Sequence, residues 1–388
     1  MHIAMVGSRG VPARYGGFET CVEEVGRRLV ERGHRVRVYC RGSAAATDSY
    51  LGMDLVRLPA IRLKSLETLS HTGLSMAHLA AHRADVALVF NCANAPFLPL
   101  LRGSRIPFAT HVDGLEWKRA KWGANGRRYY RRAEALAVRW SDALIADAQG
   151  IADYYSDQFG ADTELISYGA PLLDGVGSGR LAEVGVSARG YHLVVARFEP
   201  ENHVAEIVEG YVRSSASKRL VVIGSAPYAD DYTHRIQRLV DSRVTLLGAV
   251  WDQELLDQLY ANCFTYLHGH SVGGTNPSLL RALGAGVPTI AMDVSFNREV
   301  LADAGEYFVD PESIARAIEH AEADPASMAA RGTLTRQRAA RYDWDAVTVR
   351  YEELFRRLAN GDVPRVRPSG ARRAGAPANP GAPWSNES

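Results

Sequence analysis

Short apolar runs alternate with helical patterns along most of the chain, and this alternation restricts the fold more than any other feature. The run Ile3–Val6 stops at Gly7, and the residues up to Gly33 then show the spacing of an amphipathic helix. Apolar residues recur there at Phe18, Val22, Val25 and Leu29. The segment Arg35–Cys40 alternates as the next strand. Strands separated by helices predict parallel βαβ units.

The pattern occurs in both halves of the chain. In the first half, further strands are predicted over Val86–Phe90, Pro107–His111 and Ala143–Ala146. In the second half, strands are predicted over His192–Ala196, Arg219–Gly224, Val244–Gly248, Cys263–Leu267 and Pro288–Met292, and helices over Gln253–Ala261 and Pro277–Gly284. The sequence therefore predicts an α/β fold of two doubly wound domains with parallel sheets, over residues 1–172 and 190–340. A hinge rich in Gly and Pro joins them.

Composition excludes several classes of protein. The 45 Lys and Arg residues balance 44 Asp and Glu residues, so no charge excess points to nucleic acid. The four cysteines lie far apart without a CxxC pair, which predicts a reducing compartment and no structural zinc. The sequence shows neither a leader-like pattern nor an apolar run of the roughly 20 residues that a membrane helix needs. We expect a cytoplasmic protein that can also lie at the inner face of the membrane.

Two glycine-containing loops follow predicted strands, where doubly wound sheets bind ligands. The loop Gly7–Gly17 either provides turns or lets a phosphate or sugar approach the backbone, and it lacks the GxGxxG spacing of dinucleotide enzymes. The segment His268–Arg281 is the denser constellation. Asn276 is a good N-cap and Pro277 suits the first helical position, so the amides ahead of them can bind a diphosphate, unless this is simply a well-capped helix.

Polar and basic residues follow three other predicted elements. Arg197 comes directly after a strand and can reach a phosphate or form a surface ion pair. The segment His111–Arg119 supplies acid, base and hydroxyl-binding groups, or ordinary loop residues. The stretch Arg127–Arg132 reads as a basic helix that can meet an anionic membrane surface, or as a solvated face. His268 and His270 lie two residues apart without a third ligand, so we expect no metal site.

At these residues the sequence resembles GT-B glycosyltransferases of family 4, over residues 1–358. Within that family it resembles the subgroup with a GSRGVPARYGGFET-type N-terminal loop, which includes bacterial rhamnosyltransferases. The segments that carry the resemblance are this loop, His111–Gly123, Val195–Asn202, His268–Leu280 and Gly286–Leu301. Residues 341–359 resemble the helix that in this fold crosses back to the N-terminal domain, and residues 360–388, rich in Pro, Gly, Ala and Arg, are expected to be a disordered tail.

The resemblance implies a retaining, metal-independent enzyme without a cofactor. It would move a sugar, with rhamnose as one candidate, from a nucleotide diphosphate sugar to a glycan or lipid-linked acceptor in cell-envelope or exopolysaccharide synthesis. The implied catalytic-site residues beside the transferred sugar are Asp113 and His111. The implied donor-binding residues are Gly16, Gly17, Arg197, Asn202, Gly274, Thr275, Asn276 and Arg281. The implied acceptor-binding residues are Arg14, Tyr15 and Glu116.

Two departures from the family pattern affect the donor site. Asn202 stands where the wider family usually has Lys, and Gly273 and Arg281 stand where it has two carboxylates. The second carboxylate usually holds the donor ribose, and losing a hydrogen bond to a charged group costs about 1.5–3 kcal/mol, or about ten-fold or more in affinity. Arg281 can instead meet the diphosphate, or mark a non-catalytic relative that binds a glycan or a protein partner.

Overall fold

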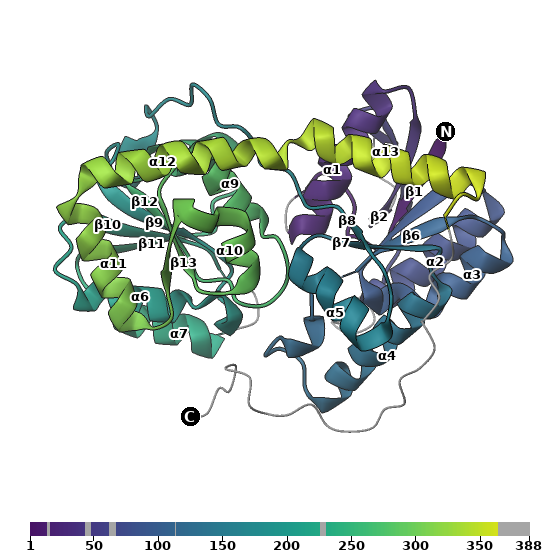
Figure 1. Ribbon diagram of the computed structural model, residues 1–388, viewed down its shortest axis with the longest axis horizontal. Coiled ribbons are helices and arrows are strands. Elements are labelled where there is room, and N and C mark those ends of the chain that lie inside the picture. Colours follow the sequence, from purple (N-terminus) through teal and green to yellow (C-terminus); the bar gives the residue numbers. More distant parts are fainter. Residues whose placement is uncertain (14–15, 43–47, 62–66, 113, 226–229, 364–388) are drawn as a thin grey trace.

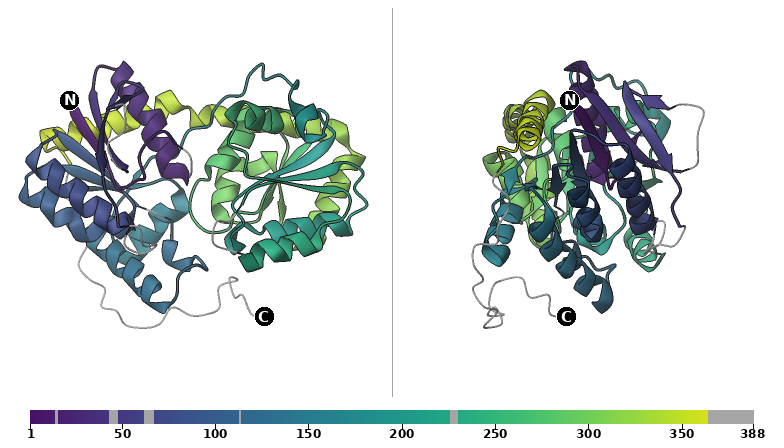
Figure 2. Two further views of the ribbon diagram at one scale, coloured as in Figure 1. Left: turned by 180° about the vertical axis from the view of Figure 1, so that it is seen from behind. Right: turned by 90° about the vertical axis from the view of Figure 1, so that its right-hand side faces the viewer.

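The computed structural model describes residues 1–363 except 14–15, 43–47, 62–66, 113 and 226–229. It contains two α/β lobes side by side, each built around its own sheet, with two consecutive C-terminal helices spanning both lobes (Figure 1). The two lobes also remain distinct when the molecule is seen from behind (Figure 2).

The N-terminal lobe has an eight-stranded sheet in the order β3-β4-β2-β1-β5-β6-β7-β8. Its strands are β1 (His2–Val6), β2 (Arg35–Arg41), β3 (Ser49–Tyr50), β4 (Met53–Leu58), β5 (Val86–Phe90), β6 (Phe108–His111), β7 (Ala143–Ala146) and β8 (Glu164–Leu165). Its helices are α1 (Gly16–Glu31), α2 (Glu67–Ala81), α3 (Leu98–Gly103), α4 (Ala124–Trp140) and α5 (Gln149–Phe159). Among the described strands only the β3–β4 pair is antiparallel.

The C-terminal lobe has a parallel six-stranded sheet in the order β11-β10-β9-β12-β13-β14. Its strands are β9 (Tyr191–Val195), β10 (Arg219–Ile223), β11 (Val244–Gly248), β12 (Thr265–His268), β13 (Thr289–Met292) and β14 (Gly305–Phe308). Its helices are α6 (Val204–Arg213), α7 (Asp230–Leu239), α8 (Gln253–Asn262), α9 (Pro277–Ala285), α10 (Ser295–Leu301), α11 (Pro311–Ala323) and α12 (Pro325–Ala339).

The central strands are continuous apolar runs because both of their faces are covered by helices. All five residues of β5 are buried, and Ile3 of β1 is paired with Val86 in parallel register. The prediction of parallel α/β units is confirmed. It missed β4, whose apolar residues are interrupted by Asp54 and Arg57, and β14, which begins at a glycine.

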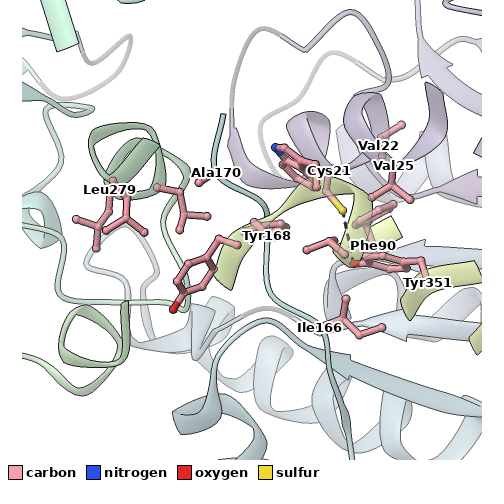
Figure 3. Packing of buried hydrophobic residues seen from close by; sticks show 14 of the residues in the cluster. Cys21, Val22, Val25, Phe90, Ile166, Tyr168, Ala170, Leu279 and Tyr351 are labelled. Atoms are coloured by element: carbon pink, nitrogen blue, oxygen red, sulfur yellow. Dashed lines mark hydrogen bonds between the residues drawn. The ribbon is translucent and has the colours of Figure 1, made fainter. Parts of the chain in front are cut away.

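Helix α13 (Trp344–Asn360) returns from the C-terminal lobe and packs on α1 of the N-terminal lobe. Tyr351 is fully buried there, and the Cys21 thiol lies 3.5 Å from its hydroxyl oxygen (Figure 3). The Trp344 indole packs against Gly169, at the start of the connection between the lobes. One apolar cluster therefore runs from the N-terminal sheet through α13 to Leu279 of the C-terminal lobe (Figure 3).

Among the described residues, no helix combines the length and the apolar composition needed to cross a membrane. The predicted tail lies outside the described residues from 364 onward. The predicted basic stretch Arg127–Arg132 lies in α4, on the outside of the N-terminal lobe (Figure 1).

Candidate active site

A cavity of about 550 Å³ lies between the two lobes, where the carboxyl ends of their strands face each other. The N-terminal lobe contributes the start of α1 and the loop after β6, with Gly16, Gly17, Gly114 and Glu116. The C-terminal lobe contributes the loops after β9 and β12, with Arg197, Asn202, Gly274, Thr275 and Asn276, and helix α9, with Arg281. The structure thus brings together all the predicted donor-binding residues and the predicted acceptor residue Glu116.

The loop after β12 ends in a well-specified helix start. The Asn276 side chain accepts a hydrogen bond from the Ser278 amide at 2.9 Å, and Pro277 occupies the first position of α9. A Cβ on Gly17 would lie 3.3 Å from Cγ of Pro277, so the two lobes meet closely here. A helix N-terminus carries partial positive charge, and this one borders the cavity.

The loop after β9 is held in place by Asn202. Its Nδ2 donates to the Arg197 carbonyl at 2.8 Å, and its Oδ1 lies 2.7 Å from Nδ1 of His270. The Arg197 side chain itself stays half-exposed in the cavity wall, 3.4 Å from Glu199. Asn202 therefore fixes the loop and adds no charge, while the Arg197 guanidinium is a cation at the cavity wall.

His268, the last residue of β12, and His270, in the loop after it, are both buried. Burial lowers the pKa of His268 to about 3 and holds that of His270 well below its usual range. Both side chains are therefore neutral near pH 7 and form part of the wall. No group of three His, Cys, Asp or Glu side chains that could hold a metal ion occurs among the described residues.

His111 is buried and does not line the cavity. Its ring is fully buried below the cavity, stacked on Tyr168 with ring centres 5.6 Å apart, and burial lowers its pKa to about 4. His111 therefore lies buried at the end of β6 and is not among the residues that line the cavity, and its catalytic role stays a prediction. The other predicted catalytic-site residue, Asp113, and the predicted acceptor residues Arg14 and Tyr15 lie outside the described residues.

Glu116 lines the cavity, but its carboxylate interacts with side chains of its own loop. Its carboxylate lies 2.5 Å from Arg119 and 2.8 Å from Lys121, and it accepts a hydrogen bond from the Trp122 indole. Arg119 also reaches Glu199 and Glu201 of the other lobe, at 3.8 and 3.6 Å. The loop after β6 is thus an ion-paired contact between the lobes at the edge of the cavity.

Arg281 forms an ion pair with Asp257 of α8, within the C-terminal lobe. Both side chains are about one quarter exposed, and Arg281 also lines the cavity. In this structure its guanidinium is paired with a neighbouring helix, an arrangement that the loop sequence alone does not indicate.

The sequence analysis missed three residues at the interface between the lobes: Asp147, Gln149 and Glu299. The Asp147 carbonyl accepts a hydrogen bond of 2.6 Å from the hydroxyl of Thr275, a predicted donor-binding residue of the other lobe. The Gln149 amide donates to both oxygens of Glu299, at 2.9 and 3.1 Å. Asp147 is a carboxylate directly after β7, and its place at a strand end was a signal available in the sequence.

Comparison with known proteins shows which class of protein has this fold and sequence. Residues 187–338 match the family model "Glycosyl transferases group 1", and residues 1–171 match a domain of unknown function, DUF1972. No curated protein sequence matched the chain. Among solved structures, sucrose-phosphate synthase from Thermosynechococcus elongatus is similar with a TM-score of 0.79 at 20% identity, covering 93% of this chain and 99% of that one.

Two further solved structures have the same two-lobed architecture. Anabaena HepE in complex with UDP has a TM-score of 0.73 at 17% identity, covering 92% of this chain and 100% of that one. An Escherichia coli trehalose-6-phosphate protein bound with UDP-2-fluoro glucose has a TM-score of 0.72 at 11% identity, covering 92% of this chain and 99% of that one. The chain has the GT-B fold. With a group 1 domain on that fold, it is a glycosyltransferase.

Proposed function

We propose that the chain transfers a sugar from a nucleotide diphosphate sugar to a glycan or lipid-linked acceptor, with retention of anomeric configuration and without a metal ion. Rhamnose is a candidate sugar, and cell-envelope or exopolysaccharide synthesis is the proposed setting. The observation that carries this proposal is the cavity in which the start of α9 and Arg197 face the glycines of α1 across the two lobes.

The diphosphate of the donor fits the chemistry of the C-terminal side of this cavity. Backbone amides at a helix N-terminus and a half-exposed guanidinium are the groups that proteins use for phosphate oxygens. These groups supply positive charge without a metal ion. The similar structures of HepE and the Escherichia coli protein, solved with UDP and a UDP-sugar, support the same ligand class here.

Retention is proposed from the resemblance to family 4. In such a reaction an oxygen of the leaving diphosphate takes the proton of the acceptor hydroxyl on the same face of the sugar, and the hydroxyl oxygen bonds the anomeric carbon as the bond to the diphosphate breaks. The role of the protein is then to hold the diphosphate and exclude water. Proton NMR of the first product formed would distinguish retention from inversion.

A peripheral contact with an anionic membrane is proposed for α4. Arg127, Arg128, Arg131 and Arg132 are exposed, while Glu134, the single acidic residue of this helix, is buried. Such a face would attract anionic lipid by about 1 kcal/mol per basic residue near the surface. It would place an enzyme with a lipid-linked acceptor at the inner face of the membrane.

The proposal is tested first by thermal unfolding with UDP, dTDP and GDP. A ligand at 100 times its dissociation constant adds about 2.7 kcal/mol to the free energy of unfolding. We expect one of the three to raise the unfolding midpoint, and no shift with any of them would overturn the proposal. The nucleotide that binds then selects the labelled nucleotide sugars for transfer assays with a membrane lipid extract.

Replacing Arg197 by alanine should weaken binding of that nucleotide by about ten- to one-hundred-fold, because hydrogen bonds to charged groups contribute about 1.5–3 kcal/mol. Titration calorimetry measures the change. Arg213→Ala is the matched control, since Arg213 is an exposed arginine of the same lobe paired only with Glu209 among the interactions described. Equal affinities of the two variants would contradict a diphosphate contact by Arg197.

The Asp257–Arg281 ion pair allows a direct test of the departure from the family pattern. The double variant Asp257→Arg, Arg281→Glu keeps an ion pair but places a carboxylate at position 281, where the family holds the donor ribose. We expect the nucleotide to bind about ten-fold more tightly, because one hydroxyl-to-carboxylate hydrogen bond is gained. Unchanged or weaker binding in titration calorimetry would show that position 281 does not touch the nucleotide.

A further inference from the structure

Asp147 is a buried carboxyl group at the point where the two lobes meet. It follows β7 of the N-terminal lobe, its residue is 6% exposed, and it lines the cavity. Its Oδ1 is the atom nearest to the position that a Cβ on Gly274 would take. The carboxyl group therefore lies against the loop of residues 273–276, to which the proposed function assigns the donor diphosphate.

The carboxyl group is incompletely satisfied by its surroundings. Oδ1 is buried without a hydrogen-bond partner in the part of the chain that the structure describes. A buried carboxylate oxygen without a partner is costly, and burial favours the neutral form. The Asp147 carboxyl group thus lies beside the loop that an anionic ligand would approach.

The groups that face Asp147 are mostly neutral or acidic. The like charge of Glu299 in α10 raises the pKa of Asp147, while hydrogen bonds from the Tyr168 hydroxyl and the Thr275 amide to the carboxyl group lower it. Besides burial, the charge of Asp147 also raises the pKa of two buried groups nearby, the Cys21 thiol of α1 and the Tyr351 hydroxyl of α13. Burial is the largest effect and raises the pKa of Asp147 to about 7, so both protonation states are populated near neutral pH.

We propose that Asp147 is a donor-binding residue whose protonation controls affinity for the donor: the neutral carboxyl group admits the diphosphate to the loop of residues 273–276, and the carboxylate opposes it. The inference rests on the proposed function. The carboxylate would compete with the diphosphate for the amides of this loop and repel its charge, whereas the carboxylic acid can donate a hydrogen bond to a phosphate oxygen. The proton is taken from solvent and stays on the protein.

The test compares wild type with Asp147→Asn, an isosteric change that removes the charge. Affinities for UDP, dTDP and GDP are measured by titration calorimetry at pH 7 and pH 8.5. If only the neutral form binds, the apparent affinity of the wild type falls with the neutral fraction. The ratio of the affinity of the Asp147→Asn variant to that of the wild type should therefore rise about ten-fold between these pH values, and taking the ratio cancels titration of the nucleotide itself.

Two further variants keep the test decisive. Asp147→Ala also lacks the charge and should show the same rise, which covers the case in which the Asp147→Asn protein does not fold. Asp153→Asn removes an exposed carboxylate of α5 outside the cavity and should follow the wild type at both pH values. A constant ratio for both Asp147 variants overturns the inference alone, while a wild type that none of the three nucleotides binds overturns the proposed function and the inference together.

Discussion

Replacing Gly114 by alanine should lower kcat/KM of sugar transfer by about 100-fold, the cost expected when reacting groups are displaced by about 1 Å. Gly114 lies in the loop after β6, and a Cβ there would lie 2.8 Å from the Gly274 nitrogen and closer still to the Gly273 backbone. A backbone cannot turn aside as a flexible side chain can. The lobes would have to separate, or the 273–276 loop would have to move.

The matched control is Gly123→Ala, in the same loop. Among the described residues, and apart from its chain neighbours, no atom lies within 4 Å of the position that its Cβ would take, and Gly123 has an ordinary φ of −71°. We expect kcat/KM of this variant to stay within about two-fold of the wild type, since surface changes away from special features alter free energies by about 0.5 kcal/mol or less. If both glycine variants transfer sugar equally well, close contact between the lobes at Gly114 is not required for catalysis.

Replacing Trp344 by alanine should lower the free energy of unfolding by about 3–5 kcal/mol, the range for truncating a buried aromatic side chain. Trp344 is 5% exposed and begins the helix that ties the C-terminal lobe to α1. Its indole packs against Gly169 and belongs to the apolar cluster shared by the lobes. Urea denaturation followed by circular dichroism measures the loss.

Trp251→Ala is the control for this change in size. Trp251 is 60% exposed, so its removal should change the free energy of unfolding by about 0.5 kcal/mol or less. Comparable losses in the two variants would mean that the start of α13 does not hold the lobes together. A broader or two-step transition in Trp344→Ala alone would show the lobes unfolding separately.

The fold could be predicted because its signal is local. Each central strand is a buried apolar run, and each following helix has its own periodicity, so the βαβ units are readable without knowledge of long-range contacts. Strand β4 was missed because Asp54 and Arg57 interrupt its apolar residues. Its place in the sheet depends on pairing with β2, which the segment itself does not show.

The site was predictable only as far as strand ends and helix caps define it. Asn276 and Pro277 are recognisable from local chemistry, and the structure places them at the cavity. His111 also lies at the end of a strand, but its ring is buried because Phe18 and Tyr168, from distant segments of the chain, cover it. Arg281 likewise finds Asp257 only through the packing of α8 on α9.

The contact between Gln149 and Glu299 has a consequence for motion of the lobes. The N-cap position of α5 is Ala148, which makes no side-chain cap hydrogen bond, and the carboxylate that accepts from the Gln149 amide belongs to the other lobe. The first turn of α5 is therefore capped by a side chain of the other lobe. Separating the lobes would uncap this helix, so amide hydrogen exchange at the start of α5 would report directly on how often the cavity opens.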